Sequence, residues 1–280
     1  MTSPRSLAFG AVLILGGAAC ATFDAANDDG PVTAEVASPT ATPKVFVGGP
    51  QIGETVDPSE EPDTAGDPAS EPGARPGRGA WVVRANDARL TVWDHSGADA
   101  SARFAVETSN PWDQPISFPV VKSRVASDGS TWYRVLLGVE PNGSNGWIRA
   151  DDVALAKATD RIVVDMSRRV LRHYHHGNLR HRFRIGVGKA TTPTTPGRYF
   201  VWAHLHPSDP SGPYGSYLLG LSGFSEVLKD WPGGGRMAIH GTSDRNDRGG
   251  AVSSGCVRVY NLQMERLRRV PMGTTVIIRR

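Results

Sequence analysis

The sequence predicts a mostly β protein in which two folded modules follow a long N-terminal segment. Short runs rich in Val, Ile, Tyr and Trp recur from residue 81 onward and are broken by turn-forming dipeptides, as is typical of short strands. Only one stretch, starting near Asn261, has the apolar spacing of a helix. The composition, 39% hydrophobic and 21% charged, excludes wholly disordered and multi-span membrane proteins.

Residues 1–20 have the pattern of an export signal. Arg5 supplies a positive start, an apolar or small-residue stretch runs from Leu7 to Ala19, and Cys20 follows. This stretch is shorter than the roughly twenty residues that span a bilayer core. Three alternatives stay open: a lipoprotein lipidated on Cys20 and anchored in the membrane, a released protein cleaved near Ala19 or Ala21, and an uncleaved anchor. Each places the mature chain outside the cytoplasm, in the cell envelope or the medium.

Residues 21–79 are predicted to form a disordered, acidic, proline-rich linker. Residues 21–78 hold nine prolines but only two aromatics, so they cannot bury enough apolar surface to offset the entropy of ordering. They carry eleven acidic and three basic residues, a net charge of −8, whereas residues 79–280 carry 17 acidic and 27 basic residues, a net charge of +10. The basic half is either an ordinary solvated surface or a surface for anionic wall polymers or lipid head groups; nucleic acid is a poor candidate outside the cell.

Residues 80–157 are predicted to form a small β barrel. The β-type runs are Trp81–Val83, Arg89–Trp93, Thr131–Leu136 and Gly146–Arg149, and the dipeptides Asn142-Gly143 and Asn145-Gly146 are predicted turns. The run from Ser130 to Val135, the glycine-rich turn and Gly146-Trp147-Ile148 together resemble a bacterial SH3-like domain. This region contains no constellation of reactive side chains.

Residues 159–280 are predicted to form a second, mostly β module. Predicted strands cover 170–174, 197–202, 236–240 and 275–279, and a hairpin turn is expected at 175–178. In the second arm of this hairpin Leu179, His181, Phe183, Ile185 and Val187 are predicted to face a core, with Arg180, Arg182 and Arg184 towards solvent. A short helix is predicted to begin with Asn261 as its N-cap and to bury Leu262, Met264 and Leu267.

Cys256 and His240 are the candidate reactive pair. Apart from Cys20, Cys256 is the only thiol in the chain, and an unpaired cysteine in an oxidising compartment needs a reason. Gly255 before it permits a tight turn whose amides can point at an oxyanion, and Arg258 could hold a thiolate or a substrate carboxylate. A nucleophilic thiol also needs an imidazole within hydrogen-bond reach, which His240 can supply if adjacent strands bring the two together. Each residue alone could equally be a structural one.

The motifs around this pair resemble the catalytic signature of the L,D-transpeptidases with a YkuD-type domain. They are His240-Gly241-Thr242, the run Ser253-Ser254-Gly255-Cys256-Val257-Arg258-Val259, and Asn261. The resemblance extends to Thr194–Tyr199, Gly212–Tyr214 and Val270–Val276, and it covers about residues 159–280. One departure is Ser254, where the family usually has His. The resemblance implies a β-sandwich catalytic domain with few short helices.

Residue by residue, the resemblance implies Cys256 as nucleophile, His240 as base oriented by the carbonyl of Gly241, and an oxyanion held by the amides of Gly255 and Cys256. The candidate substrate-binding residues are Arg258, Ser254, Ser253, Asn261 and Tyr214. Tyr214 and Tyr217 either form a lid or are packing residues. No cofactor is implied, because exchanging one amide for another is nearly balanced in free energy.

The implied reaction is acyl exchange on peptidoglycan stem peptides. Cys256 would release the terminal D-Ala of a tetrapeptide stem, and the amine of a second stem would resolve the acyl-enzyme into a 3→3 crosslink. Alternatives are an L,D-carboxypeptidase and a non-catalytic wall-binding protein with a degenerate site. The S-x-x-K and K-T-G motifs of serine D,D-transpeptidases are absent, as is a sortase context for the cysteine. No catalytic metal is expected, because a hairpin turn and strand positions explain the two groups of histidines.

Overall fold

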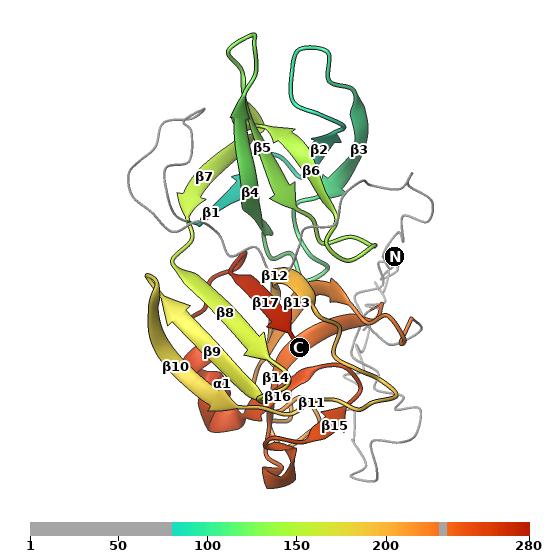
Figure 1. The fold of residues 1–280 in the computed structure, drawn as a ribbon, viewed down its shortest axis with the longest axis vertical. Helices are drawn as coiled ribbons and strands as arrows, with labels where there is room; N and C mark the ends of the chain where they lie inside the picture. Colours follow the sequence, from blue (N-terminus) through green and yellow to red (C-terminus); the bar gives the residue numbers. More distant parts are fainter. Residues whose placement is uncertain (1–79, 230–233) are drawn as a thin grey trace, which may run out of the picture. The chain divides into compact units, whose positions relative to one another are not determined.

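Figure 1 shows the computed structural model, which describes residues 80–229 and 234–280. The predicted signal segment with Cys20 and the predicted linker 21–79 lie outside the described residues. The described chain is mostly strands with one short α-helix, which confirms the predicted mostly β class. No helix within these two ranges is long and apolar enough to cross a membrane.

The first sheet has seven antiparallel strands in the order β3-β2-β6-β5-β4-β1-β7. Its strands are β1 (Trp81–Ala85), β2 (Arg89–Trp93), β3 (Ala102–Glu107), β4 (Ser117–Val125), β5 (Thr131–Leu136), β6 (Asn145–Arg149) and β7 (Val153–Lys157), with a 3-10 turn η1 (Ala150–Asp152) before β7. Alternate residues such as Val83, Tyr133 and Ile148 point into one buried cluster. The SH3-like identity of this region stays a prediction.

The predicted turn at Asn145-Gly146 is wrong, because both residues belong to β6. Gly146 is needed there for a different reason: a Cβ at this position would lie 2.2 Å from a methyl group of Val92 on the neighbouring strand β2. The turn comes earlier, where Gly143 has a φ of 82°. Gly146 is therefore explained by close packing between two strands and not by a chain reversal.

The second sheet has eight strands in the order β10-β9-β8-β17-β12-β13-β14-β16. They are β8 (Asp160–Asp165), β9 (Val170–His175), β10 (Asn178–Arg184), β12 (Gly197–Leu205), β13 (Leu218–Phe224), β14 (Arg236–Thr242), β16 (Val257–Tyr260) and β17 (Thr275–Arg279). Two pairs, β8 with β17 and β14 with β16, are parallel and the others are antiparallel. A separate parallel pair joins β11 (Val187–Gly188) to β15 (Ala251–Ser253), and η2 (Arg245–Asp247) and α1 (Asn261–Leu267) complete the region.

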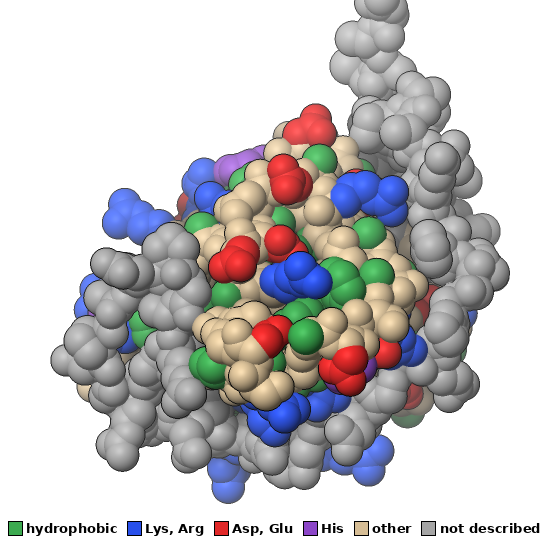
Figure 2. All heavy atoms as spheres, turned by 90° about the horizontal axis from the view of Figure 1, so that it is seen from above, with side chains coloured by type: hydrophobic (Ala, Val, Ile, Leu, Met, Phe, Trp, Pro, Cys, Tyr) green, Lys and Arg blue, Asp and Glu red, His purple; other side chains and the backbone are tan. Residues whose placement is uncertain are grey.

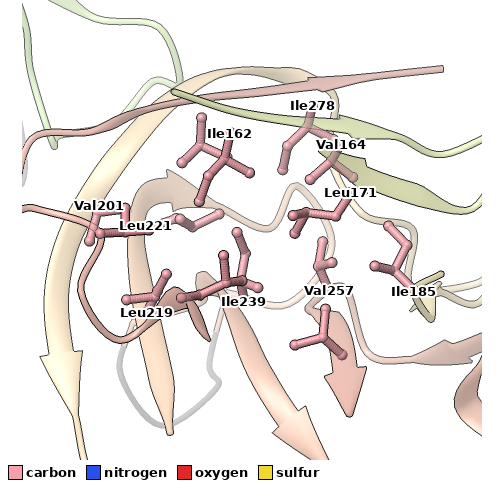
Figure 3. Close-up of a cluster of buried hydrophobic side chains, with 14 of the residues drawn as sticks. Ile162, Val164, Leu171, Ile185, Val201, Leu219, Leu221, Ile239, Val257 and Ile278 are labelled. Carbon is pink, nitrogen blue, oxygen red and sulfur yellow. The ribbon is translucent and has the colours of Figure 1, made fainter. Parts of the chain in front are cut away.

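The core of this region lies on one face of the eight-stranded sheet. Figure 3 shows its apolar side chains, among them Ile162, Leu171, Leu219, Ile239 and Val257, pointing toward one another. Strand β12 serves two cores, because Val201 joins this cluster whereas Phe200, on the opposite face, packs against Phe118 of β4 with ring centroids 6.1 Å apart. Burying such aliphatic and aromatic side chains is the main favourable contribution to folding, roughly 1.5–3 kcal/mol for each large one.

Two predicted core residues are exposed. Leu179 is 53% exposed because a β-bulge follows it: Leu179 pairs with Tyr174, whereas His181 pairs with His173, so the extra residue moves Leu179 to the opposite face from His181 and Phe183. The three arginines of β10 are exposed as predicted. Leu262 is 78% exposed, since α1 buries only the stripe of Met264 and Leu267. The N-cap position of α1 is Tyr260, and the helix begins at Asn261 itself.

Candidate active site

Two parallel strands bring His240 near the segment that carries Cys256. In the pairing of β14 with β16, Ile239 lies opposite Val257 and His240 opposite Arg258. Ile239 and Val257 point into the core (Figure 3), so His240 and Arg258 point to the other face. Cys256 lies directly before β16, two residues before Arg258. The register therefore brings the strand of His240 beside the strand that follows Cys256, although the two residues are sixteen apart in the chain.

His240 is held in one tautomer. Its ring is 2% exposed, and its Nδ1 lies 2.8 Å from the carbonyl oxygen of Gly241. A carbonyl oxygen can only accept, so Nδ1 carries the hydrogen and, in the neutral ring, Nε2 is left with its lone pair. Tyr214 packs edge-on against the ring, with centroids 5.4 Å apart. The arrangement presents a fixed proton acceptor.

The turn that carries Cys256 is held by Ser253, whose side chain is buried. Its hydroxyl donates to the carbonyl of Cys256 at 2.5 Å and accepts from the N–H of Gly255 at 3.2 Å. Gly255 has a φ of 116°, a conformation that side chains disfavour, which explains a glycine directly before the half-buried cysteine. The amide of Gly255 thus already has a partner. The amide of Gly255 could therefore bind the predicted oxyanion only after breaking its hydrogen bond to Ser253.

The preceding strand segment supports the same turn from the other side. The N–H of Lys189 and the hydroxyl of Thr192 both donate to the carbonyl of Ser253, at 2.9 and 3.2 Å. Gly188 in turn donates to the hydroxyl of Thr194 at 2.9 Å. From the sequence, Thr194 stood out only as part of the family resemblance. No local sequence pattern indicated that Lys189 and Thr192 contact a turn that lies 61 or more residues later in the chain.

Arg258 is paired with a buried carboxylate. Its Nη1 lies 3.3 Å from Asp247, which is 3% exposed and also accepts the hydroxyl hydrogen of Thr242 at 2.5 Å. Asp247 therefore links β16 to β14 two residues beyond His240. Asp247 therefore partly neutralises the guanidinium of Arg258, the residue that the sequence predicted to bind a substrate carboxylate. Asp247 and Thr242 were not identified from sequence, since no spacing rule points to them.

Asn261 holds the loop that bears Tyr214. Its Nδ2 donates to the carbonyl of Pro210 at 2.9 Å, and its Oδ1 accepts from the N–H of Ser216 at 3.0 Å. Close packing completes the contact, because a Cβ at Gly215 or Gly241 would lie 2.2 or 2.3 Å from Asn261 Oδ1. Asn261 therefore positions a loop, whereas the sequence offered it as a substrate-binding residue. Ser254, the other candidate, is half-buried between Ser253 and Gly255.

The remaining histidines have partners of their own. His173 Nε2 and His175 Nδ1 contact the two oxygens of Asp160 at 2.5 and 3.1 Å. His204 Nδ1 lies 2.7 Å from the hydroxyl of Tyr217, which is buried, so Tyr217 is a packing residue and not part of a lid. Across the two described ranges no group of three His, Cys, Asp or Glu side chains is arranged to hold a metal ion.

A family model and two curated relatives all match this chain to the same protein family. A family model described as the YkuD L,D-transpeptidase catalytic domain matches residues 159–278. The chain is 34% identical over 162 residues to a YkuD protein of Bacillus licheniformis, covering 55% of this chain and 90% of that one. It is 32% identical over 129 residues to the Bacillus subtilis YkuD protein, covering 46% and 65%.

One similar solved structure is the C442S mutant of the Enterococcus faecium L,D-transpeptidase, which is 25% identical to this chain. The match covers 43% of this chain and 50% of that one, with a TM-score of 0.35. An L,D-transpeptidase from Mycobacterium smegmatis has 16% identity, 54% and 91% coverage, and the same TM-score. The chain thus spans about half the length of the Enterococcus structure and most of the length of the mycobacterial one.

Proposed function

This chain belongs to the YkuD family of L,D-transpeptidases, and we propose that it acts on peptidoglycan tetrapeptide stems through a Cys256 acyl-enzyme. The observation that carries the proposal is the register of β14 and β16, which pairs His240 with Arg258, two residues after Cys256. The hydrogen bond from His240 to Gly241 supports it, because it leaves Nε2 to accept the thiol proton.

The proposed reaction has two acyl transfers. The Cys256 sulfur attacks the carbonyl carbon between the third stem residue and D-Ala while His240 takes the thiol proton. The C–N bond breaks, the proton passes to the departing amine of D-Ala, and a thioester remains. The side-chain amine of a second stem then attacks the thioester, gives its proton to His240, and restores the thiol as the 3→3 crosslink forms. One amide is broken and one is made, so no cofactor or nucleotide is required.

The oxyanion of each tetrahedral intermediate needs preorganised donors. We assign the N–H of Cys256 as the first donor, because the turn at Gly255 fixes its direction. The N–H of Gly255 is the second donor only once it exchanges Ser253 Oγ for the oxyanion. Ser253 then keeps its bond to the Cys256 carbonyl and holds the turn in place.

Tyr214 and its loop are assigned to the side of the site facing His240. The edge-on contact covers the imidazole ring, and exclusion of water there would favour the amine over hydrolysis. We assign Arg258 and Ser254 to contacts with the stem peptide. Asn261 supports this assignment indirectly, as the residue that fixes the loop bearing Tyr214.

The test is mass spectrometry of the protein mixed with a disaccharide-tetrapeptide, with Cys256→Ala as control. We expect a thioester adduct, free D-Ala and a crosslinked dimer with wild type alone. D-Ala release without a dimer would instead identify an L,D-carboxypeptidase. No adduct and no product, with equal binding of both proteins to sacculi, would identify a wall-binding protein and overturn the enzymatic proposal.

The place of action is proposed from residues 1–20 together with the family. Export puts the chain where stem peptides are, and lipidation of Cys20 would anchor it to the membrane. Intact-mass analysis of the mature protein distinguishes the alternatives: a diacylglycerol on Cys20 indicates a lipoprotein, and an unmodified chain beginning near residue 20 indicates a released one.

A further inference from the structure

The face of the eight-stranded sheet opposite the core carries an arginine-rich row. Arg182 on β10 pairs with Arg172 on β9, which pairs with Val163 on β8, and the row continues through Ile277 on β17 to Arg198 on β12. Register partners share a face, so three arginines from three strands point to the same side. Val163, Ile277 and Arg198 are buried, so the accessible part of the row is the exposed Arg182 and the half-buried Arg172. We call this side, from β10 to β12 only, the outer face.

The neighbouring rows of the outer face add more arginines. Arg161 on β8 lies over the ring of Tyr174 at 4.8 Å, and Arg184 and Arg279 are exposed at the other end. Among the described residues of these three rows the one acidic side chain is Asp165, which forms ion pairs with Arg172 and with Arg168 at 3.7 and 3.6 Å. The outer face therefore has a surplus of positive charge. By contrast, the side of the molecule in Figure 2 shows acidic and basic side chains interspersed.

The N-terminal segment enters the fold next to this face. The N–H of Ala158 donates to the carbonyl of Ala80 at 2.8 Å, and Trp81 of β1 pairs with Lys157 of β7. Asp160, which begins β8, and Arg161 of the outer face follow directly in the chain. Whatever precedes residue 80 is thus joined to the folded region a few residues from the start of β8.

The sequence just before this point is strongly acidic. Residues 54–71, which lie outside the described residues, contain seven acidic residues and no basic one. Glu71 is nine residues from Ala80, and nine extended residues reach about 30 Å. The ends of the arginine row lie two strands from β8 on either side, about 10 Å away. The acidic residues can therefore reach the exposed arginines of the outer face, Arg182 and Arg184 on β10 and Arg279 on β17.

We propose that the acidic segment 54–71 docks on the arginine-rich outer face of the same chain. Carboxylates form strong charge-assisted hydrogen bonds with guanidinium groups, and the covalent link gives the segment a high effective concentration compared with any free polyanion. The docked segment competes with other polyanions for these arginines. This inference does not depend on the proposed enzymatic function.

Competition with inorganic polyphosphate tests the proposal in the full chain. One variant neutralises four acids of the segment (E60Q, E61Q, D63N, D67N), and a matched control neutralises four more distant acids (D24N, D28N, D29N, E35Q). Both raise the net charge by four. We expect polyphosphate affinity to rise at least about fivefold in the first variant and less than about twofold in the control. Adding R182Q and R184Q to the first variant is expected to remove the gain, whereas adding R84Q and R89Q on the first sheet is not.

Two outcomes overturn the proposal. Equal gains in both quadruple variants would mean that only net charge matters. No gain in either would mean that the face is open and serves an external polyanion. A direct measurement uses a spin label on T64C in a C20S/C256S background. It should broaden the amide signals of Arg161 and Arg182 at low salt, and a label on T33C should not; equal broadening by both labels would contradict a specific docking contact.

Discussion

The two sides of the candidate active site are built differently. The cysteine turn, Ser253–Cys256, is fixed by a buried hydroxyl within it and by two donors from the segment that follows β11. The tyrosine loop, Pro210–Ser216, is joined to α1 by the side chain of Asn261, which makes two hydrogen bonds to the loop.

This difference matches what each side has to do in the proposed mechanism. There the nucleophile has to be held within a fraction of an ångström of its attack position, so several independent bonds are of use. The loop has to let a peptide in and then exclude water, which a smaller number of bonds permits. The comparison predicts that damage to the turn affects the chemical step and that damage to the loop affects substrate binding.

The largest effect is expected from removing the reacting groups themselves. Cys256→Ala and His240→Ala should each lower turnover by about a thousandfold or more, with the melting temperature nearly unchanged. Steady-state crosslinking assays and thermal unfolding measure the two quantities. Retained turnover in Cys256→Ala would exclude the cysteine mechanism and, with it, the role assigned to the turn.

A smaller effect is expected when the turn is loosened without touching the thiol. Ser253→Ala removes a buried hydroxyl and leaves the Cys256 carbonyl and the Gly255 amide short of a partner, which costs about 1–3 kcal/mol of stability. We expect kcat to fall by about tenfold or more while KM changes little. Ser127→Ala, at an exposed turn of the first sheet, is the control for both measurements. A change confined to KM would contradict the role assigned to the turn.

Releasing the tyrosine loop should act on binding. Asn261→Ala removes both bonds to the loop, and we expect KM to rise by about three- to tenfold with a smaller change in kcat. Asn261→Asp keeps the acceptor for Ser216 and loses the donor to Pro210, so its effect should be intermediate. Equal effects of the two variants, or a loss in kcat alone, would show that the loop is not held through Asn261.

The smallest effect is expected from acidification, which should act on the tyrosine loop before it acts on the turn that carries Cys256. Hydrogen bonds from the hydroxyl and N–H of Ser211 lower the pKa of Asp209, which braces the start of the loop. A lowered folded-state pKa means that the contribution of Asp209 to stability is present above its unfolded pKa and is lost as the pH falls through the folded value. Acidification below about pH 4 should therefore shift NMR signals of the loop before those of the turn. Simultaneous shifts in both would contradict independent bracing.

Local pattern predicted several strands well and missed others for identifiable reasons. The run 131–136 is rich in aromatic and β-branched residues and coincides with β5, and 275–279 coincides with β17. Strand β13 was missed because its glycines imitate turn signals. In the structure a Cβ at Gly223 would lie 2.2 Å from Tyr199, so the glycine allows a large ring to pack against the strand. Strand β4 was missed because its apolar and polar residues do not alternate along its whole length.

Residue types and their spacing along one or two strands were enough to predict the mostly β class, the candidate pair of His240 and Cys256, and the glycine before the thiol. The polar groups that brace these residues could be identified only from the folded chain. Asp247 joins Arg258, Asn261 reaches Ser216 45 residues away, and Thr192 reaches Ser253 across 61 residues. Such partners are chosen by the packing of distant segments, and a buried polar group takes whichever partner the fold brings within reach.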